Sequence, residues 1–388
     1  MPGFEVLGKE EQKYISRIIE NGFVLSRDSF DDKRNGVFTV AEFEKAMARR
    51  LGFRHSYGVS SGTAALKCAL KALGIKPGDE VITSSHTFIA TAEAIVDCGA
   101  IPVFVEADKT LNIDPHDIER RITEKTKAII PVHMYGAAAD MDKIMAIAGK
   151  HNLKVLEDSA QGYFAKYRGR LVGTFGDITA ISFDPVKIIT TGEGGMILTN
   201  NEKLFKASRE FADHGHESNP KFPRGEDTRS IVGFNFRMGE MQAAIGLGQL
   251  EKADNVLNTL RKNKSRIKQG ISSSKIEFRH FNDDDHVADV LVFYVDNKEQ
   301  VSGIAKILKE NRIGTKNLPG AFRWHFAGTW DHFLSDYEAY KDIKSKEYWP
   351  KTRELLERTV AIPIFVKMDD DDIERHIKAI NRAFDEIL

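Results

Sequence analysis

The pattern of hydrophobic and polar positions is most regular between about residues 45 and 200. Short apolar bursts alternate there with amphipathic stretches, a rhythm typical of a mostly parallel sheet with helices on both faces. The pattern therefore predicts an α/β fold. Six bursts are predicted strands: EVITS (80–84), PVFVE (102–106), AIIPVHM (128–134), KVLED (154–158), ITAISF (178–183) and GMILTN (195–200).

Helical periodicity marks the segments between and after these strands. In TAALKCALKAL, the residues Leu66, Leu70 and Leu73 share one helical face, and a longer helix is predicted at about 238–260. That long helix could link two domains. We therefore predict a large domain over residues 1–260, with the amino-terminal segment included.

The pattern changes after the long helix. KIEFRHF and ADVLVFYV are predicted strands, and a helix is predicted near 299–310. The acidic run Asp369–Asp372 suits the amino terminus of a closing helix, because the helix dipole favours negative charge there. We predict a smaller α+β domain over residues 261–388.

Composition narrows the function classes. The 388 residues carry 56 Lys and Arg against 57 Asp and Glu, with the signs interspersed, so no basic field exists for nucleic acid or an anionic bilayer. No apolar run reaches the roughly 18 residues of a membrane span, and charges interrupt the amino terminus where a signal peptide would be apolar. Cys68 and Cys98 match neither a disulfide framework nor a metal-ligand spacing. We expect a cytoplasmic enzyme of small-molecule chemistry, without a metal.

The strongest chemical signal is the segment SFDPVKIITTGEGGMILTN. Lys187 lies there between a strand end and a glycine-dense turn that leads into the next strand. An amine that forms an imine needs a short, rigid connection, and the glycines let the chain and a flat cofactor approach closely. A lysine in a loop is usually only a solvated charge, so the case for a catalytic Lys187 depends on other residues of the same region.

Two companions occur in the same alternating region. Asp158 ends the strand KVLED, and the carboxyl edge of a parallel sheet is where ligands bind in such folds. Ser61, Gly62 and Thr63 open an amphipathic helix, whose free backbone amides and dipole suit a phosphate. Ordinary helix capping explains either feature taken alone. Their combination with Lys187 favours a phosphorylated aldehyde cofactor, pyridoxal 5'-phosphate (PLP).

The linked motifs resemble those of the DegT/StrS family of PLP-dependent sugar aminotransferases, which have fold type I. SGTAAL, HTFIATAEAI, PVHMYG, EDSAQG, SFDPVKIITTGEGG and GFNFRMGEMQAAIG occur in the family order, and the likeness runs from the amino-terminal region to the last helix. The resemblance implies a large, mostly parallel-sheet domain with a smaller carboxyl-terminal domain. It also implies a homodimer with shared active sites.

The resemblance also implies a role for each site residue. Lys187 would hold the cofactor as an internal imine, and Asp158 would pair with its ring nitrogen. The other cofactor contacts would be Gly62, Thr63 and Ser182 to the phosphate, Phe88 stacked on the ring, Gln161 near the phenolic oxygen, and Asn235 to the phosphate of the neighbouring subunit's cofactor.

The reaction implied by the resemblance moves an amino group from L-glutamate to a keto sugar. Some family members have histidine in place of the lysine and catalyse dehydration, whereas this chain has Lys187 and keeps the group that transamination needs. NLPGAFRWHFAGTWDHFL is similar to a segment of transaminases that make 8-amino-3,8-dideoxy-manno-octulosonate for lipopolysaccharide, from 3,8-dideoxy-8-oxo-manno-octulosonate. The alternatives are a nucleotide-linked keto sugar and a non-catalytic PLP-binding regulatory protein.

Several polar residues keep two interpretations at this point. Arg237 or Arg323 could bind the substrate carboxylate, or could lie at the surface or a dimer interface. His325 and His332 lack the further ligands of a metal site and could belong to a substrate pocket or an interface. His133 could be a structural histidine or a site residue.

Overall fold

The computed structural model describes residues 2–21, 24–28, 30–219, 221–223, 226–272, 274–281, 286–316 and 320–388. Its centre is a seven-stranded sheet with the strand order β1-β9-β8-β5-β4-β2-β3. The pairs from β3 to β8 are parallel, and β9 pairs antiparallel with both β8 and β1. The strands are β1 (His55–Val59), β2 (Glu80–Ser84), β3 (Ile101–Val105), β4 (Thr126–Ile130), β5 (Lys154–Asp158), β8 (Ile178–Ser182) and β9 (Gly195–Thr199).

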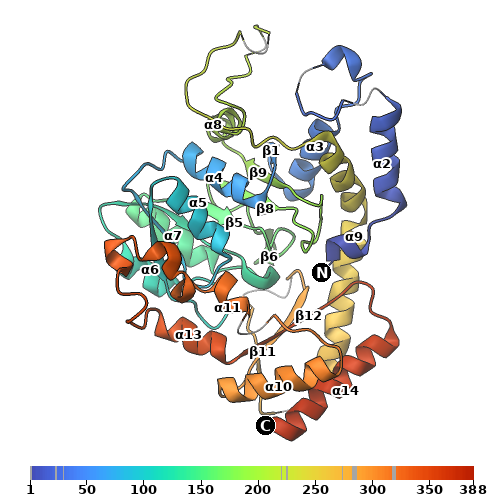
Figure 1. Ribbon diagram of the computed structural model, residues 1–388, viewed down its shortest axis with the longest axis vertical. Coiled ribbons are helices and arrows are strands. Elements are labelled where there is room, and N and C mark those ends of the chain that lie inside the picture. Colours follow the sequence, from blue (N-terminus) through green and yellow to red (C-terminus); the bar gives the residue numbers. More distant parts are fainter. Residues whose placement is uncertain are drawn as a thin grey trace.

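Helices cover both faces of this sheet, as the alternating pattern predicts (Figure 1). Neighbouring residues of a strand enter different cores because side chains alternate between faces. Val81 and Leu156 pack with α4, α5 and α8, whereas Ile82 and Val155 pack with α3, α7 and α9. The helices of this part are α1 (Pro2–Glu5), α2 (Lys9–Glu20), α3 (Thr39–Leu51), α4 (Gly62–Ala72), α5 (Ile89–Asp97), α6 (Pro115–Arg121), α7 (Met141–His151), α8 (Glu202–Ala212) and α9 (Glu240–Gly270).

The predicted strands differ from the observed ones in detail. EVITS and KVLED have the predicted bounds, but AIIPVHM ends as a strand at Ile130 because Pro131 has no backbone N–H to donate to the ladder. Strand β1 was not predicted, since HSYGV shows no long apolar run. It is nevertheless buried, and it forms one edge of the sheet by pairing with β9.

A second, three-stranded sheet follows α9. Its strands β10 (Glu277–Phe278), β11 (Val290–Tyr294) and β12 (Thr359–Pro363) are antiparallel. Helix α14 (Asp370–Ile387) begins as predicted: Asp369 caps it, and its side chain accepts from the backbone N–H of Asp372 at 2.7 Å. The remaining helices are α10 (Lys298–Glu310), α11 (Gly320–His325), α12 (Asp331–Leu334) and α13 (Pro350–Glu357).

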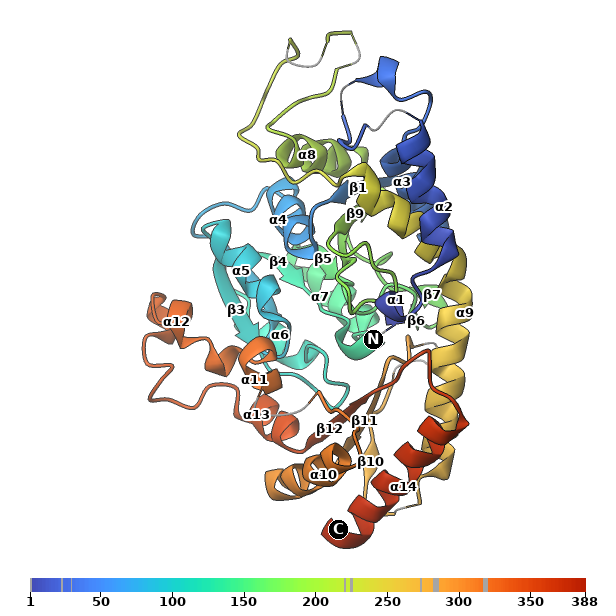
Figure 2. The same cartoon turned by 45° about the vertical axis from the view of Figure 1, so that its right-hand side comes forward.

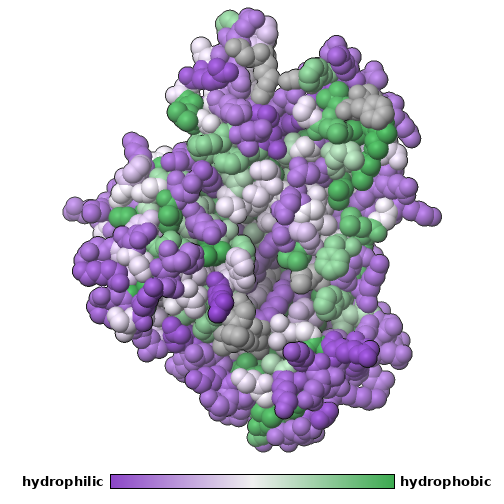
Figure 3. All heavy atoms as spheres, in the orientation of Figure 1, coloured by the Kyte–Doolittle hydropathy of each residue, from purple (hydrophilic) through white to green (hydrophobic). Residues whose placement is uncertain are grey.

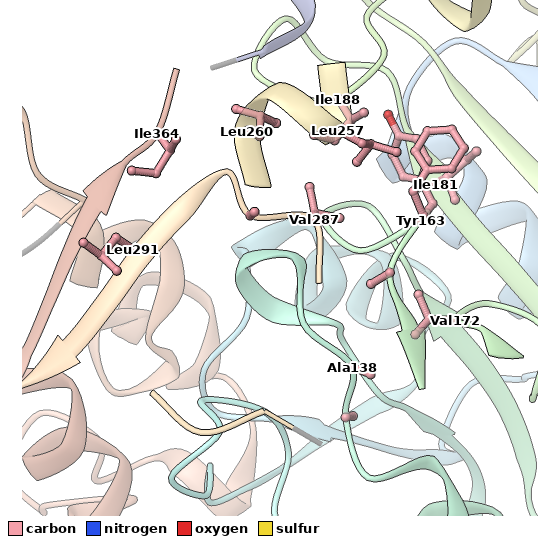
Figure 4. Close-up of a cluster of buried hydrophobic side chains, with 14 of the residues drawn as sticks. Ala138, Tyr163, Val172, Ile181, Ile188, Leu257, Leu260, Val287, Leu291 and Ile364 are labelled. Atoms are coloured by element: carbon pink, nitrogen blue, oxygen red, sulfur yellow. The ribbon is translucent and has the colours of Figure 1, made fainter. Parts of the chain in front are cut away.

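Helix α9 connects the two sheets along one side of the molecule (Figures 1 and 2). It runs unbroken past residue 260, where we place the domain boundary, so the division falls within a helix. One hydrophobic core joins the parts. Figure 4 shows Leu257 and Leu260 of α9 between side chains of the large sheet region, which are Tyr163, Ile181 and Ile188, and those that follow α9, which are Val287, Leu291 and Ile364.

The long helix also buries a lysine. Lys264 is 6% exposed and lies over the ring of Phe281, 4.9 Å from its centroid, and burial lowers the pKa of its amine to about 7. A lysine whose folded pKa lies below its unfolded value of about 10.4 destabilises the fold as the pH falls through that window. The Lys264→Met variant is therefore expected to gain about 2–4 kcal/mol in free energy of unfolding at pH 7.

The measurement is denaturant unfolding at several pH values between about 7 and 10, the interval between the two pKa values. Wild-type stability should rise with pH across this interval, whereas Lys264→Met should lose most of that slope. Lys262→Met is the matched control, because Lys262 is exposed on the same helix. Equal slopes in the wild type and Lys264→Met would contradict the prediction.

Candidate active site

A cavity of about 640 Å³ lies at the carboxyl ends of the central parallel strands. Asp158 ends β5 and Ser182 ends β8, so the sheet itself brings these two side chains to the same edge. Seven predicted site residues line the cavity: Gly62, Thr63, Phe88, Asp158, Gln161, Ser182 and Lys187. Residues from four separate chain regions therefore meet, as the motif order predicts.

The start of α4 forms one end of the cavity. The Ser61 hydroxyl accepts from the N–H of Ala64 at 3.0 Å, which caps the helix and leaves the first backbone amides directed past its start. Gly62 lies against Ser182: a Cβ on Gly62 would lie 2.7 Å from the Ser182 Cβ and 3.0 Å from its Oγ. Only glycine allows this approach, which places a hydroxyl beside a helix amino terminus, a combination that suits a phosphate group.

This close approach predicts the effect of a larger side chain. Gly62→Val would push α4 away from β8, and overpacking of this kind costs roughly 1–3 kcal/mol. We expect the Kd for PLP to rise roughly 10- to 100-fold, measured by titrating the apoenzyme and following cofactor absorbance. Gly149→Val is the control, because a Cβ at Gly149 meets no atom within 4 Å. An unchanged Kd in Gly62→Val would contradict the phosphate assignment.

The loop that carries Lys187 is held rigid on several sides. Phe183 donates its N–H to the carbonyl of Gly194 at 2.9 Å, and the N–H of Thr191 donates to the carbonyl of Phe183 at 3.0 Å. These two hydrogen bonds hold the ends of the loop together. Gly3 of α1 donates to the carbonyl of Lys187 at 2.8 Å. The backbone of Lys187 is thus fixed while its side chain extends into the cavity, as the glycine-flanked pattern predicts.

The surroundings of Lys187 change the pKa of its amine. Burial lowers the pKa of the Lys187 amine, and the nearby Lys316 acts in the same direction, whereas Asp184 and Asp158 oppose the shift. An amine of lowered pKa can accept a proton near neutral pH.

Asp158 is held as an oriented acceptor. Burial raises the pKa of its carboxyl, while hydrogen bonds from the Thr91 hydroxyl at 2.8 Å and the Ala160 N–H at 3.1 Å favour the ionised form. Both oxygens therefore have donors that fix the carboxylate, and its charge faces the middle of the cavity. A cationic ring nitrogen would satisfy this carboxylate.

Tyr135 is a cavity residue that the sequence alone did not reveal. It has φ 49° and ψ 42°, a left-handed conformation that is uncommon outside glycine. Gln161 accepts its N–H at 2.9 Å, and the buried Arg279 donates to the carbonyls of Met134 at 2.9 Å and Thr110 at 2.7 Å. Arg279 comes from the part of the chain after α9, so tertiary contacts hold this strained turn in place.

Phe88 and Asn235 have different predicted roles, and they lie in different surroundings. Phe88 lines the cavity and is 41% exposed, so it is not a core residue; its ring stacks on Trp324 with the centroids 5.9 Å apart. Asn235 is exposed on the segment between α8 and α9 and does not line the cavity. Its predicted contact is with the cofactor of a neighbouring subunit, so the role of Asn235 stays a prediction.

The polar residues that had two interpretations lie in different parts of the structure. Arg237 pairs with Asp213, and Arg323 is exposed; neither lines the cavity. His325 lines the cavity, whereas His332 is exposed and packs on Phe333.

His133 is a structural residue rather than part of the cavity. It is fully buried, with Nε2 3.1 Å from Glu157, and its Nδ1 accepts from the N–H of Ala139 at 3.2 Å. Both ring nitrogens are therefore satisfied within the protein, as expected of a histidine in a core.

Besides Tyr135, the structure adds Asp289, Lys316 and Trp324 to the cavity. These three lie after α9, far from Lys187 in the chain, so only folding brings them to Lys187. Lys316 is fixed by its N–H, which donates to Ala361 of β12 at 2.8 Å, and its ammonium lies 3.8 Å from Asp289. Residues that follow α9 thus build one side of the cavity.

The fold and the family match together define the class of protein: this is a fold-type-I PLP-dependent enzyme. The DegT/DnrJ/EryC1/StrS aminotransferase family matches residues 8–381. The chain belongs to this family, and it is a PLP-dependent sugar aminotransferase. The family membership therefore favours an enzyme over the alternative of a non-catalytic regulatory protein.

Named relatives agree with this membership. Spore coat polysaccharide biosynthesis protein SpsC of Bacillus subtilis (strain 168) is 36% identical over 389 aligned positions, which cover 97% of this chain and 94% of that protein. GDP-perosamine synthase of Caulobacter vibrioides is 45% identical over 251 positions, 64% of this chain and 63% of that protein. The structure of NtdA from Bacillus subtilis with bound cofactor PMP has a TM-score of 0.81 and 26% identity, covering 98% of this chain and 83% of that one.

Proposed function

We propose that this aminotransferase moves the amino group of L-glutamate to 3,8-dideoxy-8-oxo-manno-octulosonate and forms 8-amino-3,8-dideoxy-manno-octulosonate for lipopolysaccharide. Lys316, a lysine of the cavity lining that is separate from Lys187, supports an anionic substrate. The likeness of the segment NLPGAFRWHFAGTWDHFL favours the octulosonate among such substrates. Glutamate and the octulosonate are both carboxylates, and they use one site in turn. The Lys316 ammonium forms no bond in the reaction, so it can bind the carboxylate of either substrate in turn.

We propose the following roles for the lining residues. When bound, PLP supplies an aldehyde and an electron-withdrawing ring that allow nitrogen to be taken from one substrate and given to the next. The start of α4 at Gly62 and Thr63, together with Ser182, binds the phosphate, and Asp158 holds the ring nitrogen protonated. Phe88 covers the ring, and Gln161 orients the phenolic oxygen.

Lys187 has two roles in the proposal. Its Nζ would bind the cofactor at rest, and once free the same amine would accept a proton from the substrate carbon and return it. Burial, which lowers the pKa of this amine, increases the neutral fraction that can accept the proton. The tied ends of its loop fix the backbone from which the side chain of Lys187 enters the cavity.

The enzyme is proposed to act as a homodimer. Large apolar side chains are exposed around the top of the molecule: Leu25 at 52%, Phe30 at 58%, Phe222 at 51% and Val232 at 82%. In Figure 3, hydrophobic side chains gather over the region where Figure 1 shows α2 and α3. Exposed apolar residues in such number are typical of an interface, and Asn235 lies on the same segment as Val232. Sedimentation of the holoenzyme as a monomer would contradict the dimer.

A nucleotide-linked keto sugar is the second candidate substrate. It is favoured by the 45% identity to a GDP-perosamine synthase, although that likeness covers 64% of this chain. A diphosphate is also anionic, so Lys316 does not by itself decide between the two sugars. The distinction rests on which substrate the purified enzyme consumes.

A competition assay tests the proposal. The holoenzyme receives L-glutamate with equal amounts of 3,8-dideoxy-8-oxo-manno-octulosonate and a GDP-linked 4-keto-6-deoxy sugar, and both amino products are measured beside 2-oxoglutarate. The proposal expects the amino octulosonate to dominate. It also expects Lys316→Met to raise the KM for the octulosonate, while Lys109→Met, a change of an exposed lysine, leaves it unaltered. Dominance of the nucleotide product would overturn the octulosonate assignment.

A further inference from the structure

A small side pocket adjoins the large cavity next to Tyr135. Its volume of about 20 Å³ has room for one water-sized group. His86, Tyr135, Lys316 and His325 belong to its lining, and the last three also line the large cavity. A substrate in the large cavity can therefore extend one small substituent into this pocket.

The tautomer of His86 is set by the backbone. Its Nδ1 lies 3.0 Å from the carbonyl oxygen of Leu111, and a carbonyl can only accept, so Nδ1 carries the hydrogen. Nε2 is then a bare acceptor. His86 is 1% exposed, and Nε2 has no hydrogen-bond partner among the described residues. Burial lowers the pKa of the imidazole to about 3, so the ring stays neutral.

His325 repeats this arrangement within the same pocket lining. Its Nδ1 lies 3.1 Å from the carbonyl oxygen of Ala321, which again fixes the hydrogen on Nδ1 and leaves Nε2 an acceptor. Burial lowers the pKa of this imidazole to about 4. Two neutral imidazoles, with their hydrogens committed to backbone carbonyls, thus belong to one pocket.

These acceptors restrict the chemistry of the occupant. A carboxylate or phosphate oxygen has no hydrogen to donate, so it would face the lone pairs of the two Nε2 atoms. A methyl group or a hydrogen atom in its place would leave both Nε2 atoms without a donor. A hydroxyl donates to one imidazole and can accept from the Tyr135 phenol or the Lys316 ammonium. Burial raises the pKa of Tyr135 to about 12, so its phenol remains a donor.

We propose that His86 and His325 form a subsite that selects a neutral hydroxyl of the keto sugar, with His86 Nε2 accepting its hydrogen. The inference rests on the proposed function, since it takes the substrate to be a polyhydroxylated keto sugar. It deepens that function by assigning specificity to His86, which the large cavity does not include. Sites built to accept a buried hydroxyl discriminate strongly against analogues that lack it.

The experiment compares kcat/KM for 3,8-dideoxy-8-oxo-manno-octulosonate with that for its C4-, C5- and C7-deoxy analogues. The wild-type holoenzyme should prefer the parent over one of these analogues by roughly 10- to 100-fold. His86→Leu should lose most of this preference. His325→Leu, a variant of the second histidine of the subsite, should reduce the same preference for the same analogue.

His332→Leu is the matched control and should keep the wild-type preference, because His332 is exposed and lies outside both cavities. A purely structural histidine would lower Tm without changing the ratio between two sugars. The subsite is overturned if the wild type accepts all three analogues as well as the parent, or if both leucine variants keep the preference.

Failure of the proposed function gives a different result. In that case the wild type turns over no octulosonate, and the same comparison uses a GDP-linked 4-keto sugar and its deoxy analogues. Loss of the preference in His86→Leu with those sugars supports the subsite on a different substrate. A preference that His86→Leu leaves intact overturns the subsite there as well.

Discussion

Lys187→Ala is expected to have no measurable aminotransferase activity. The change removes both the amine that binds the cofactor and the group that moves the proton, and the proton transfer alone contributes roughly 10²- to 10⁴-fold. Lys316, the other lysine that lines the cavity among the described residues, is not free to replace it, because its backbone is held by β12 and its ammonium lies 3.8 Å from Asp289. The measurement is 2-oxoglutarate formation from L-glutamate with the keto sugar supplied.

A second readout separates lost chemistry from lost folding. Borohydride should fix the cofactor covalently to the wild type at position 187, and the alanine variant should give no such adduct although it keeps its far-ultraviolet spectrum. Lys203→Ala is the control, because Lys203 is exposed on α8. Turnover by Lys187→Ala at the wild-type rate would overturn the assignment of the catalytic lysine.

Asp158→Asn is expected to lower kcat by on the order of 10²- to 10³-fold, the typical effect of removing one preorganised electrostatic partner. The amide keeps the shape of the carboxylate and can still accept from Thr91 or Ala160. It removes the negative charge that would hold a ring nitrogen protonated. Cofactor binding should persist, since the phosphate contacts at Gly62, Thr63 and Ser182 are untouched.

The comparison for this variant is Asp385→Asn, a change of the same kind at an exposed position on α14. Asp385→Asn should match the wild type in kcat. Cofactor-saturated Asp158→Asn with wild-type kcat would show that the charge of Asp158 is not needed, and the proposed role of this residue would have to be abandoned.

Several features could be predicted from the sequence because they depend on local pattern. Alternation of strands and helices gave the α/β class, and the bounds of KVLED and EVITS are those observed. The cap at Ser61 and the acidic start of α14 are confirmed, since a helix amino terminus needs nearby acceptors whatever surrounds it. The motif order also brought the predicted cofactor residues, Asn235 excepted, to one cavity.

Other features depend on contacts between distant segments. Strand β1 is specified by pairing with β9, and the left-handed Tyr135 is held by Gln161 and by Arg279, which follows 144 residues later in the chain. No local pattern encodes such contacts. For the same reason, the sequence could not choose between the two interpretations of His133 and His325, whose chemistry is the same in isolation.

The sequence by itself determined the candidate cofactor residues of this protein: a helix start, a strand-end carboxylate and a glycine-flanked lysine each follow from residues close in the chain. Only the tertiary structure decided which residues after α9 share the cavity with them. Asp289, Lys316 and His325 reach the cavity because the smaller domain packs against the edge of the sheet where β5 and β8 end. Local pattern fixes elements and their caps, whereas the packing of distant elements fixes which side chains share a cavity.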